Sequence, residues 1–257
     1  MCNRTCHHRA VGATLRVGTS GFAYDAWKGP FYPPTLRDLD LLPYYASRFT
    51  TVELNVTFRG TPTERAVANW RARTPEGFVF AVKAHARITH GARLAAPAEA
   101  QTEFLERVRG LGEKLGPILF QTPPTFGYDR GRLEAFLDSL PPDRRYAMEF
   151  RHPSWNAARP LLAERGVAWC VADTDEVPAD AIPDGPFAYL RLRKTAYDDE
   201  GLAAWADRIG RALAAGQDVF AYLKHEEEGT GPRSAARLAE LVAGAGPERR
   251  MAEERPG

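Results

Sequence analysis

One stretch of the sequence, residues 145–173, reads RYAMEFRHPSWNAARPLLAERGVAWCVAD. It begins with the β-rich run Arg145–Phe150 and ends with the apolar run Ala168–Asp173, each of strand length. Between these runs, Asn156–Arg165 carries apolar residues at helical spacing. Strand, helix and strand in this order are typical of a parallel βαβ unit.

The same unit recurs along the chain. Further runs of strand length are Leu15–Ser20, Thr51–Asn55, Val79–Ala84, Pro117–Thr122, Phe187–Leu192 and Val219–Lys224. Helix-length segments lie between or after them at Leu39–Phe49, Glu64–Arg73, Ala98–Leu115, Arg132–Leu140, Gly201–Ala215 and Ser234–Ala243. Eight such units in 257 residues match the size of a closed barrel, whereas a doubly wound open sheet usually has fewer strands. We therefore predict an α/β fold, a parallel (β/α)8 TIM barrel.

One unit departs from this pattern. Between Asp173 and Phe187, the prolines Pro178, Pro183 and Pro186 would break a long helix, so the unit between strands six and seven should lack a full one. No change of composition divides the chain, and we expect a single barrel domain over residues 15–245. Residues 1–14 are expected to form a disordered tail and residues 246–257 a frayed one.

Composition limits the classes of function. The 34 basic and 33 acidic side chains leave a net charge of +1, so no overall field favours nucleic acid or membrane as a partner. Three cysteines without a disulfide pattern, and no long apolar segment, predict a cytoplasmic protein. Cys2, Cys6, His7 and His8 are zinc-ligand types, but they lack paired spacing and a disordered tail is preferred. No cofactor is predicted, and the oligomeric state stays open.

The alternation within strands predicts which side chains face the barrel axis. In the second run, Val52 and Leu54 take one parity while Glu53 and Asn55 take the other. The same rule, applied to the other runs, predicts a set of charged residues that face the axis at the carboxyl ends of the strands: Glu53, Lys83, Glu149, Arg151, Asp173, Arg191 and Lys224. Gln121 and His85 have the same parity. Catalytic groups of barrel enzymes lie at this mouth.

Four cations and three anions in this set favour an anionic ligand, such as a phosphate or carboxylate. Arg151 and Arg191 would bind it through paired hydrogen bonds, while Lys83 and Lys224 would act as point charges. Asn55, His85, Gln121 and Asp173 complete the expected substrate contacts. The structural alternative is an ion-pair network that fills the barrel.

Three functions remain open. The preferred one is an enzyme, a hydrolase, lyase or isomerase acting on a small anionic substrate, with Glu53 or Glu149 as base and His152 or Lys83 as acid. A metal-dependent phosphodiesterase or nuclease ranks second, because no HxH or HExxH spacing is present and neighbouring cations oppose a metal. A noncatalytic ligand or nucleic-acid binder is the third.

The loop Gly21–Pro33 is rich in aromatic residues, including Tyr24 and Trp27. These two rings could stack on a base or sugar at the mouth. With equal weight, they could seal the end of the barrel as a small separate core.

With these residues in view, the chain resembles the YecE-like family, domain of unknown function seventy-two, which is assigned a TIM barrel. The resemblance covers most of the chain and rests on several motifs: Gly18-Thr19-Ser20-Gly21, Thr51-Val52-Glu53-Leu54-Asn55, Thr89-His90, Pro123-Pro124, and Glu149-Phe150-Arg151-His152 with Ser154-Trp155. It implies a barrel with a pocket and no established reaction.

The chain departs from the family pattern at the rim. Arg59-Gly60 stands where the family usually has Tyr-Arg, and Arg193-Lys194 where it usually has His-Gly. After the eighth strand, residues 224–228 replace a stretch that contains asparagine. The substrate of the family, whatever it is, need not be that of this chain.

Overall fold

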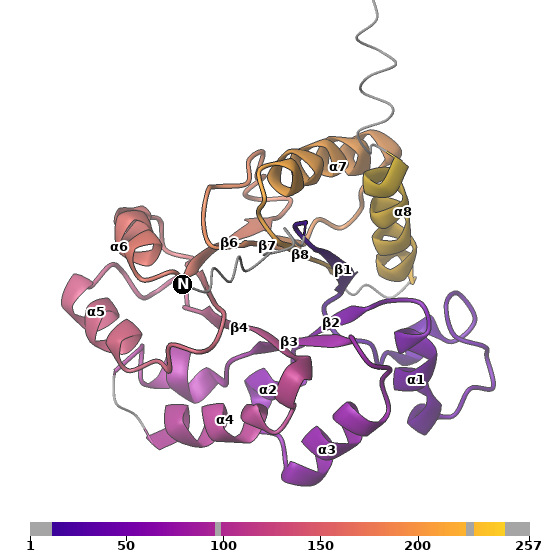
Figure 1. The fold of residues 1–257 in the computed structure, drawn as a ribbon, viewed down its shortest axis with the longest axis horizontal. Coiled ribbons are helices and arrows are strands. Elements are labelled where there is room, and N and C mark those ends of the chain that lie inside the picture. The colour runs from indigo at the N-terminus through magenta and orange to yellow at the C-terminus, as the bar shows by residue number, and fades with distance from the viewer. Residues whose placement is uncertain (1–11, 96–98, 225–228, 245–257) are drawn as a thin grey trace, which may run out of the picture.

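The computed structural model describes residues 12–95, 99–224 and 229–244. Eight parallel strands stand in a ring with helices around it, as Figure 1 shows. The strands are β1 (Leu15–Thr19), β2 (Thr51–Leu54), β3 (Val79–Lys83), β4 (Leu115–Gln121), β5 (Tyr146–Glu149), β6 (Ala168–Asp173), β7 (Ala188–Leu192) and β8 (Val219–Leu223). Seven of the predicted runs contain one of these strands, and the eighth, Pro117–Thr122, overlaps β4, which begins two residues earlier. The predicted (β/α)8 barrel is confirmed.

The helices follow the strands in the expected order. They are α1 (Leu41–Ala46), α2 (Val56–Arg59), α3 (Glu64–Ala72), α4 (Glu99–Arg109), α5 (Arg130–Asp138), α6 (Arg159–Glu164), α7 (Asp199–Ala214) and α8 (Thr230–Gly244). The four-residue helix α2 was not predicted; the Thr57 hydroxyl holds it by donating to the carbonyl oxygens of Leu54 and Lys83. The described residues between β6 and β7 contain no helix, which confirms that prediction.

The barrel closes between β1 and β2 through side chains as well as backbone. A bridge joins Ser20 to Glu53, and the Gly21 amide donates to the Glu53 carbonyl at 2.8 Å. Below it, the Tyr45 hydroxyl accepts from the Thr19 amide at 2.9 Å and donates to the Thr51 carbonyl at 3.1 Å. A Cβ at Gly18 would lie 2.2 Å from the Thr51 carbonyl oxygen, so this approach requires glycine.

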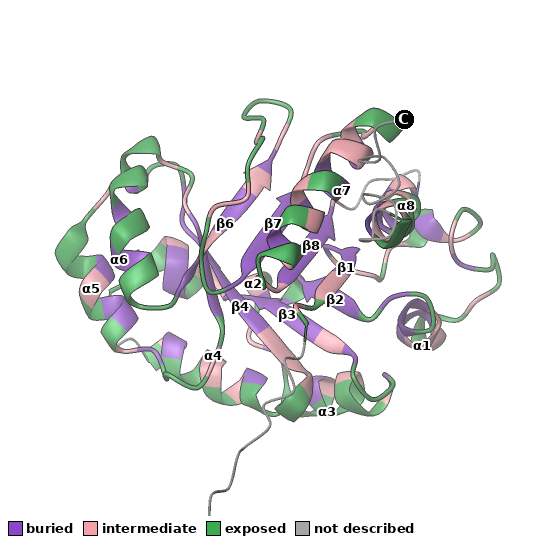
Figure 2. Cartoon of the chain, turned by 45° about the horizontal axis from the view of Figure 1, so that its top comes forward, coloured by how far each residue is buried: buried purple, intermediate pink, exposed green. Residues whose placement is uncertain are grey.

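Side chains fill the inside of the ring. One buried cluster consists of Ala81, Leu119, Ala147, Ala168, Cys170, Phe187, Tyr189, Phe220 and Tyr222. A larger cluster lies between the strands and the helices, and Figure 2 shows both along the strands as buried residues. The inner cluster shows which residues of β3 to β8 face the barrel axis. Residues two positions further along each strand face the same way, so the cluster also identifies the polar residues that face the mouth.

The ends of the chain lie largely outside the described residues. Residues 1–11 and 245–257, which include most of the two predicted tails and the group Cys2, Cys6, His7 and His8, are not described. Within the predicted N-terminal tail, the Thr14 amide and hydroxyl donate to the Asp218 carboxylate at 2.7 and 2.9 Å. In the described part of the chain, no helix has the length and apolar character needed to cross a membrane.

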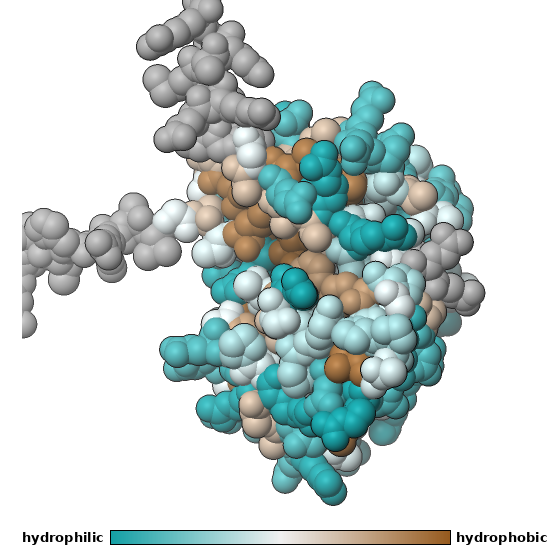
Figure 3. All heavy atoms as spheres, turned by 90° about the vertical axis from the view of Figure 1, so that its right-hand side faces the viewer, coloured by the Kyte–Doolittle hydropathy of each residue, from teal (hydrophilic) through white to brown (hydrophobic). Residues whose placement is uncertain are grey.

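The side of the barrel carrying α1 and α8 has an uneven surface. Figure 3 shows hydrophobic residues gathered at the height of α8 and mainly hydrophilic residues below them. On α8, Ala239 and Leu241 are half-buried while Ala236 and Ala243 are exposed. Nothing in the described structure indicates what would cover this area.

Candidate functional site

The mouth of the barrel is organised around Arg191, which lies near the end of β7 and is 2% exposed. Its Nη1 donates to Glu149 Oε2 at 2.6 Å and its Nη2 to Glu53 Oε1 at 2.9 Å. One guanidinium therefore joins carboxylates from β2 and β5. Planar donors in this arrangement make strong, charge-assisted hydrogen bonds.

Glu53 is fully enclosed and its carboxylate is saturated with donors. Besides Arg191, it accepts from the Ser20 hydroxyl and from the Tyr189 hydroxyl, each at 2.8 Å. Burial raises the pKa of Glu53. The charges of Arg191 and Arg193, together with these hydrogen bonds, lower it by more, so the pKa lies below the ordinary value for a glutamate. Glu53 is held as an anion.

Glu149 leads to a second chain of contacts. Its Oε1 accepts from Gln121 Nε2 at 2.6 Å, and Gln121 Oε1 accepts from Lys83 Nζ at 2.8 Å. Burial raises the pKa of Glu149, but Arg191, Arg151 and the hydrogen bonds from Arg191 and Gln121 bring it down to about 2. The structure thus brings five of the predicted site residues into one hydrogen-bonded group: Glu53, Lys83, Gln121, Glu149 and Arg191.

Lys83 is the member of this group with the most unusual protonation. Its Nζ lies 3.9 Å from the centre of the Phe58 ring on α2. Burial, and then the positive charge of Arg191, lower the pKa of Lys83 to about 8, although Glu149 acts in the opposite direction. A lysine with this pKa exchanges protons close to neutral pH.

Arg193 also belongs to the site, although the sequence analysis did not place it there. It follows Arg191 by two residues, lines the cleft at the mouth, and its Nη1 is buried with no hydrogen-bond partner among the described residues. Burial and then Arg191 lower its pKa. Its parity was the available signal, since residues two apart on a strand point the same way.

The mouth contains more cations than anions, as predicted, but the set of cations differs from the predicted one. Lys83, Arg151, Arg191 and Arg193 lie around the two carboxylates Glu53 and Glu149. Arg151 is half-exposed, and its Nε lies 3.4 Å from Glu149 Oε1. Arg191 Nε is buried without a hydrogen-bond partner in the described part of the chain. The inner mouth thus retains two buried donors, Arg191 Nε and Arg193 Nη1, without an acceptor among the described residues.

Asp173 corrects one prediction. Its carboxylate does not point to the barrel axis: Oδ2 accepts from the Tyr197 hydroxyl at 2.8 Å and from Trp205 Nε1 on α7 at 3.1 Å. Oδ1 accepts from the Ala179 amide at 2.8 Å. On β6 the inward residues are Ala168 and Cys170, so position 173 has the outward parity. Asp173 ties the β6–β7 connection to α7.

The two predicted histidines have local roles. His85 Nδ1 accepts from the Arg87 amide at 3.0 Å, and His152 Nδ1 lies 2.7 Å from the Ser154 hydroxyl at the start of a 3-10 turn over residues 153–158. Both imidazoles therefore make local contacts in the turns that follow them, and of the two only His152 also lines the cleft at the mouth.

His90 was missed as a candidate. Its ring makes an edge-to-face contact with Phe58, with centroids 5.1 Å apart, and Phe58 separates it from Lys83. Burial and the charges of Lys83 and Arg151 lower the pKa of His90. The motif Thr89-His90 was the available signal.

Asn55 and Lys224 lie at the rim. Asn55 Oδ1 is buried without a hydrogen-bond partner among the described residues. Lys224 is half-buried and its amide donates to the Leu192 carbonyl at 2.8 Å. It shares the parity of the inward-facing Tyr222, which agrees with the predicted direction.

The aromatic loop packs into the large hydrophobic cluster rather than forming a separate core. Trp27 has no exposed surface, and its ring contacts Phe31 edge-to-face with centroids 5.9 Å apart. A direct contact of Trp27 with substrate is thus not supported. The Tyr24 hydroxyl donates to the Ser20 carbonyl at 2.8 Å, and burial, modified by Arg193 and Glu53, raises the pKa of Tyr24 to about 12.

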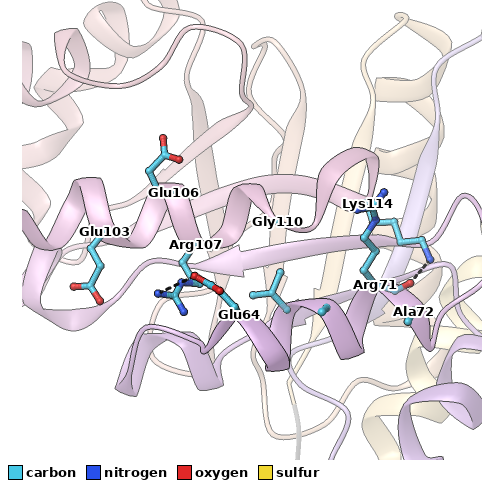
Figure 4. Close-up of a pocket in the computed structure, with 10 residues that line it drawn as sticks. Glu64, Arg71, Ala72, Glu103, Glu106, Arg107, Gly110 and Lys114 are labelled. Carbon is cyan, nitrogen blue, oxygen red and sulfur yellow. Dashed lines mark hydrogen bonds and ion pairs between the residues drawn. The ribbon is translucent and has the colours of Figure 1, made fainter.

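The inner mouth opens into a cleft of about 1000 Å³. Glu149, Arg151, His152 and Arg193 line it, together with apolar residues of β5 and β6. A second hollow, of about 770 Å³, lies on the outer surface between α3 and α4 (Figure 4). It is lined by Glu64, Arg107 and Lys114 among others and by none of the predicted site residues. Of the predicted site residues, Glu149, Arg151 and His152 line the cleft at the mouth.

No three His, Cys, Asp or Glu side chains within residues 12–95, 99–224 and 229–244 stand close enough to hold a metal ion. Glu53 and Glu149 already bind a guanidinium, and His85 and His152 use Nδ1 for local contacts. The described residues thus do not assemble the donor set that the metal-dependent alternative requires.

The barrel and this mouth can now be compared with known proteins. The model of the family described as "Protein of unknown function DUF72" matches residues 16–256. This chain belongs to the DUF72 family. The chain spans about half the length of the curated relatives it matches: UPF0759 protein YecE of Escherichia coli strain K12 is 39% identical over 146 residues, 54% of each chain. UPF0759 protein YunF of Bacillus subtilis is 32% identical over 133 residues, 48% of this chain and 47% of that one.

Solved structures agree with the DUF72 assignment. A DUF72 family protein from Thermotoga maritima has a TM-score of 0.75 at 25% identity, covering 90% of this chain and 99% of that chain. A glycoside hydrolase family 30 subfamily 8 xylanase, Xyn30A, from Clostridium acetobutylicum has a TM-score of 0.52 at 14% identity, covering 90% and 71%. The second likeness concerns the fold alone.

Proposed function

We propose that this DUF72 chain is an enzyme that binds a small anionic substrate, bearing a phosphate or a carboxylate, at the carboxyl ends of the barrel strands. The observation that carries the proposal is the surplus of buried donors: Arg193 Nη1 and Arg191 Nε have no acceptor among the described residues. Buried donors that find no partner in the protein are costly, and an anion would satisfy them.

Lys83 is the group suited to moving a proton. Its pKa of about 8 lies near neutral pH, whereas the pKa of Glu149 is about 2 and that of Glu53 is also lowered. The two carboxylates are therefore weak bases that hold Arg191, and Glu149 positions Lys83 through Gln121. We assign Lys83 as the general acid and the arginines as the groups that bind the anion.

The lowered carboxylate pKa values also argue against glycoside hydrolysis. That chemistry needs one carboxylic acid with a raised pKa to protonate the leaving group. Neither Glu53 nor Glu149 offers it.

The binding step can be tested by calorimetry at low salt with inorganic phosphate and acetate. Arg193→Gln should weaken binding of at least one anion by about tenfold, the loss of one buried charge-assisted contact. Arg65→Gln, an exposed arginine of α3, is the control and should change nothing. Equal binding by the parent and the Arg193 variant would refute the assignment.

Turnover is tested by screening phosphorylated and carboxylated metabolites. With a substrate in hand, Lys83→Met should retain binding within a fewfold and lose turnover by about 100-fold or more. Because an acid must be protonated, turnover of the parent should fall as the pH rises through about 8.

A noncatalytic binder is the second candidate. It is favoured by the saturation of Glu53, whose two oxygens accept three hydrogen bonds, from Ser20, Tyr189 and Arg191. It predicts tight binding of a ligand that Lys83→Met does not alter and that is never converted.

A further inference from the structure

The cleft at the mouth passes through the wall of the barrel. β5 and β6 pair only at Ala147–Ala168 and Met148–Trp169. Above these pairs, the consecutive residues Glu149 and Phe150 line one cavity, as do Trp169 and Cys170. Neighbouring residues of a strand face opposite sides of a sheet, so a cavity lined by both must cross the sheet where the two strands separate.

The outer half of this opening combines aromatic and apolar side chains with the polar residues Arg159, Glu176 and Asp180. Phe150 and Trp169 are half-buried, with ring centroids 5.3 Å apart. The guanidinium carbon of Arg159 lies 4.0 Å from the Trp169 ring centroid. Val177, which also lines the cleft, is 69% exposed.

The cleft stays open because the segment after β6 is not helical. Figure 2 shows this connection as a largely exposed loop, and the described residues between β6 and β7 form no helix. Prolines at 178, 183 and 186 exclude a long helix there. In a unit that carries a full helix, that helix covers the outer face of the sheet.

The inner half of the opening is cationic. Arg151 and Arg193 line it, while the charge of Glu149 is offset by its ion pair with Arg191 at 2.6 Å. The volume of about 1000 Å³ corresponds to the upper range of small-molecule sites rather than to a surface groove for a macromolecule.

We propose that this lateral cleft selects the substrate, and that the substrate is a small molecule with an anionic group at one end and a flat aromatic group at the other. The anionic group binds between Arg151 and Arg193, and the aromatic group lies against Phe150, Trp169 and Val177. This rests on the proposed function, because the anion site is shared, and it adds the second half of the substrate.

Neither half alone would satisfy the cleft. A bare anion such as phosphate leaves the solvent-facing parts of the half-buried Phe150 and Trp169 rings in water. A neutral aromatic molecule leaves the buried Arg193 donor without an acceptor. A ligand with both groups removes both costs at once, beside the Arg159 guanidinium that already lies over one face of Trp169.

The experiment compares matched ligand pairs on the full chain by calorimetry at low salt: phenyl phosphate against inorganic phosphate, and phenylacetate against acetate. Within at least one pair, the aromatic member should bind about tenfold or more tightly than the bare anion, as expected for burial of one ring. Phenol alone should bind weakly.

Two variants locate the aromatic subsite. Val177→Asn changes an exposed residue that lines the cleft, and Leu39→Asn changes a residue of the same 69% exposure that does not line it. Val177→Asn should reduce the aromatic preference about threefold and leave binding of the bare anion unchanged, while Leu39→Asn should alter neither. Trp169→Leu, which keeps an apolar side chain, should reduce the preference further.

The outcomes separate the two proposals. Binding of a bare anion that Arg193→Gln weakens, without any aromatic preference, would overturn this inference and leave the proposed function standing. An aromatic preference that Val177→Asn and Trp169→Leu both leave intact would place the ring elsewhere and also overturn it. Absence of binding for all four anions would remove the proposed function and this inference together.

Discussion

At the residue scale, the decisive feature is one arginine shared by two buried carboxylates. Arg191 holds Glu53 and Glu149 at 2.9 and 2.6 Å, and all three side chains are 5% exposed or less. Removing one partner of a buried ion pair leaves the other charge without compensation. The stability of the mouth and its chemistry therefore depend on the same contacts.

Arg191→Gln should lower the free energy of unfolding by about 3–5 kcal/mol, because Glu53 and Glu149 lose the buried cation that they share and Glu149 keeps only the half-exposed Arg151 at 3.4 Å. Urea unfolding followed by circular dichroism measures this loss. Arg151→Gln is the matched control: its side chain is 50% exposed and it should cost less than about 1 kcal/mol. Similar losses in both variants would mean that the ion pairs of Arg191 contribute little.

Lys83 should titrate apart from the other lysines. Its pKa of about 8 predicts that half of its amines are neutral near that pH, so acetic anhydride should acetylate it with a midpoint near pH 8. Hydrogen bonds that Lys28 donates to Asp38 and Asp25 instead raise the pKa of Lys28, which serves as the internal reference. Peptide mass spectrometry gives both profiles, and a Lys83 profile that parallels Lys28 would contradict the lowered pKa.

At the element scale, the seam between β1 and β2 depends on the close approach of their backbones. A Cβ added at Gly18 would lie 2.2 Å from the Thr51 carbonyl oxygen. Gly18→Ala should therefore destabilise the protein by about 1–3 kcal/mol, the usual cost of overpacking a tight contact. Gly60→Ala is the control, since a Cβ there meets nothing within 4 Å and its backbone is extended. Equal urea midpoints for the two variants would show that the seam can relax.

At the scale of the whole molecule, the buried carboxylates link folding to pH. The folded state lowers the pKa of Glu149 from 4.5 to about 2, so the unfolded chain binds more protons between these values. The stabilisation from this group is complete above about pH 4.5 and is lost as the pH falls toward 2. It amounts to about 3 kcal/mol.

Urea unfolding of the parent at neutral pH and near pH 3 should therefore show a steep loss of stability in acid. Glu149→Gln cannot titrate at this position, so its loss over the same range should be smaller. Surface carboxylates contribute equally in both proteins and cancel in the difference. Parallel curves for parent and variant would show that Glu149 has an ordinary pKa in the folded state.

Local patterns of the sequence were sufficient for the elements and for most of the site. Eight runs of strand length, separated by helical periodicity, predicted the strands and their parallel order. The alternation within β2, β3, β5 and β7 correctly turned Glu53, Lys83, Glu149 and Arg191 toward the axis, because the two-residue period of a strand is a local property. The prolines after Asp173 likewise predicted the missing helix.

Some site residues were placed wrongly or missed, because the two-residue period of a strand was not applied to them or does not extend into the loops. Asp173 was placed by its position at the end of a run, whereas counting from the inward Cys170 gives it the outward parity and its contacts with Tyr197 and Trp205. Counting onward from Arg191 would have added Arg193. His152 lines the cleft, while the Nδ1 atoms of both His85 and His152 contact the turns that follow them, which the period of a strand does not predict.

The sequence by itself determined the number of strands, their order and the face on which most charged residues lie, because each of these follows from spacing within a few residues. Only the tertiary structure decided which charges meet: Arg191 contacts Glu149 and Glu53, which lie 42 and 138 residues away along the chain. It also decided that β5 and β6 separate above Met148–Trp169 and leave a cleft. Both depend on the stagger and closure of all eight strands together, a geometric condition of the complete barrel that no single segment contains.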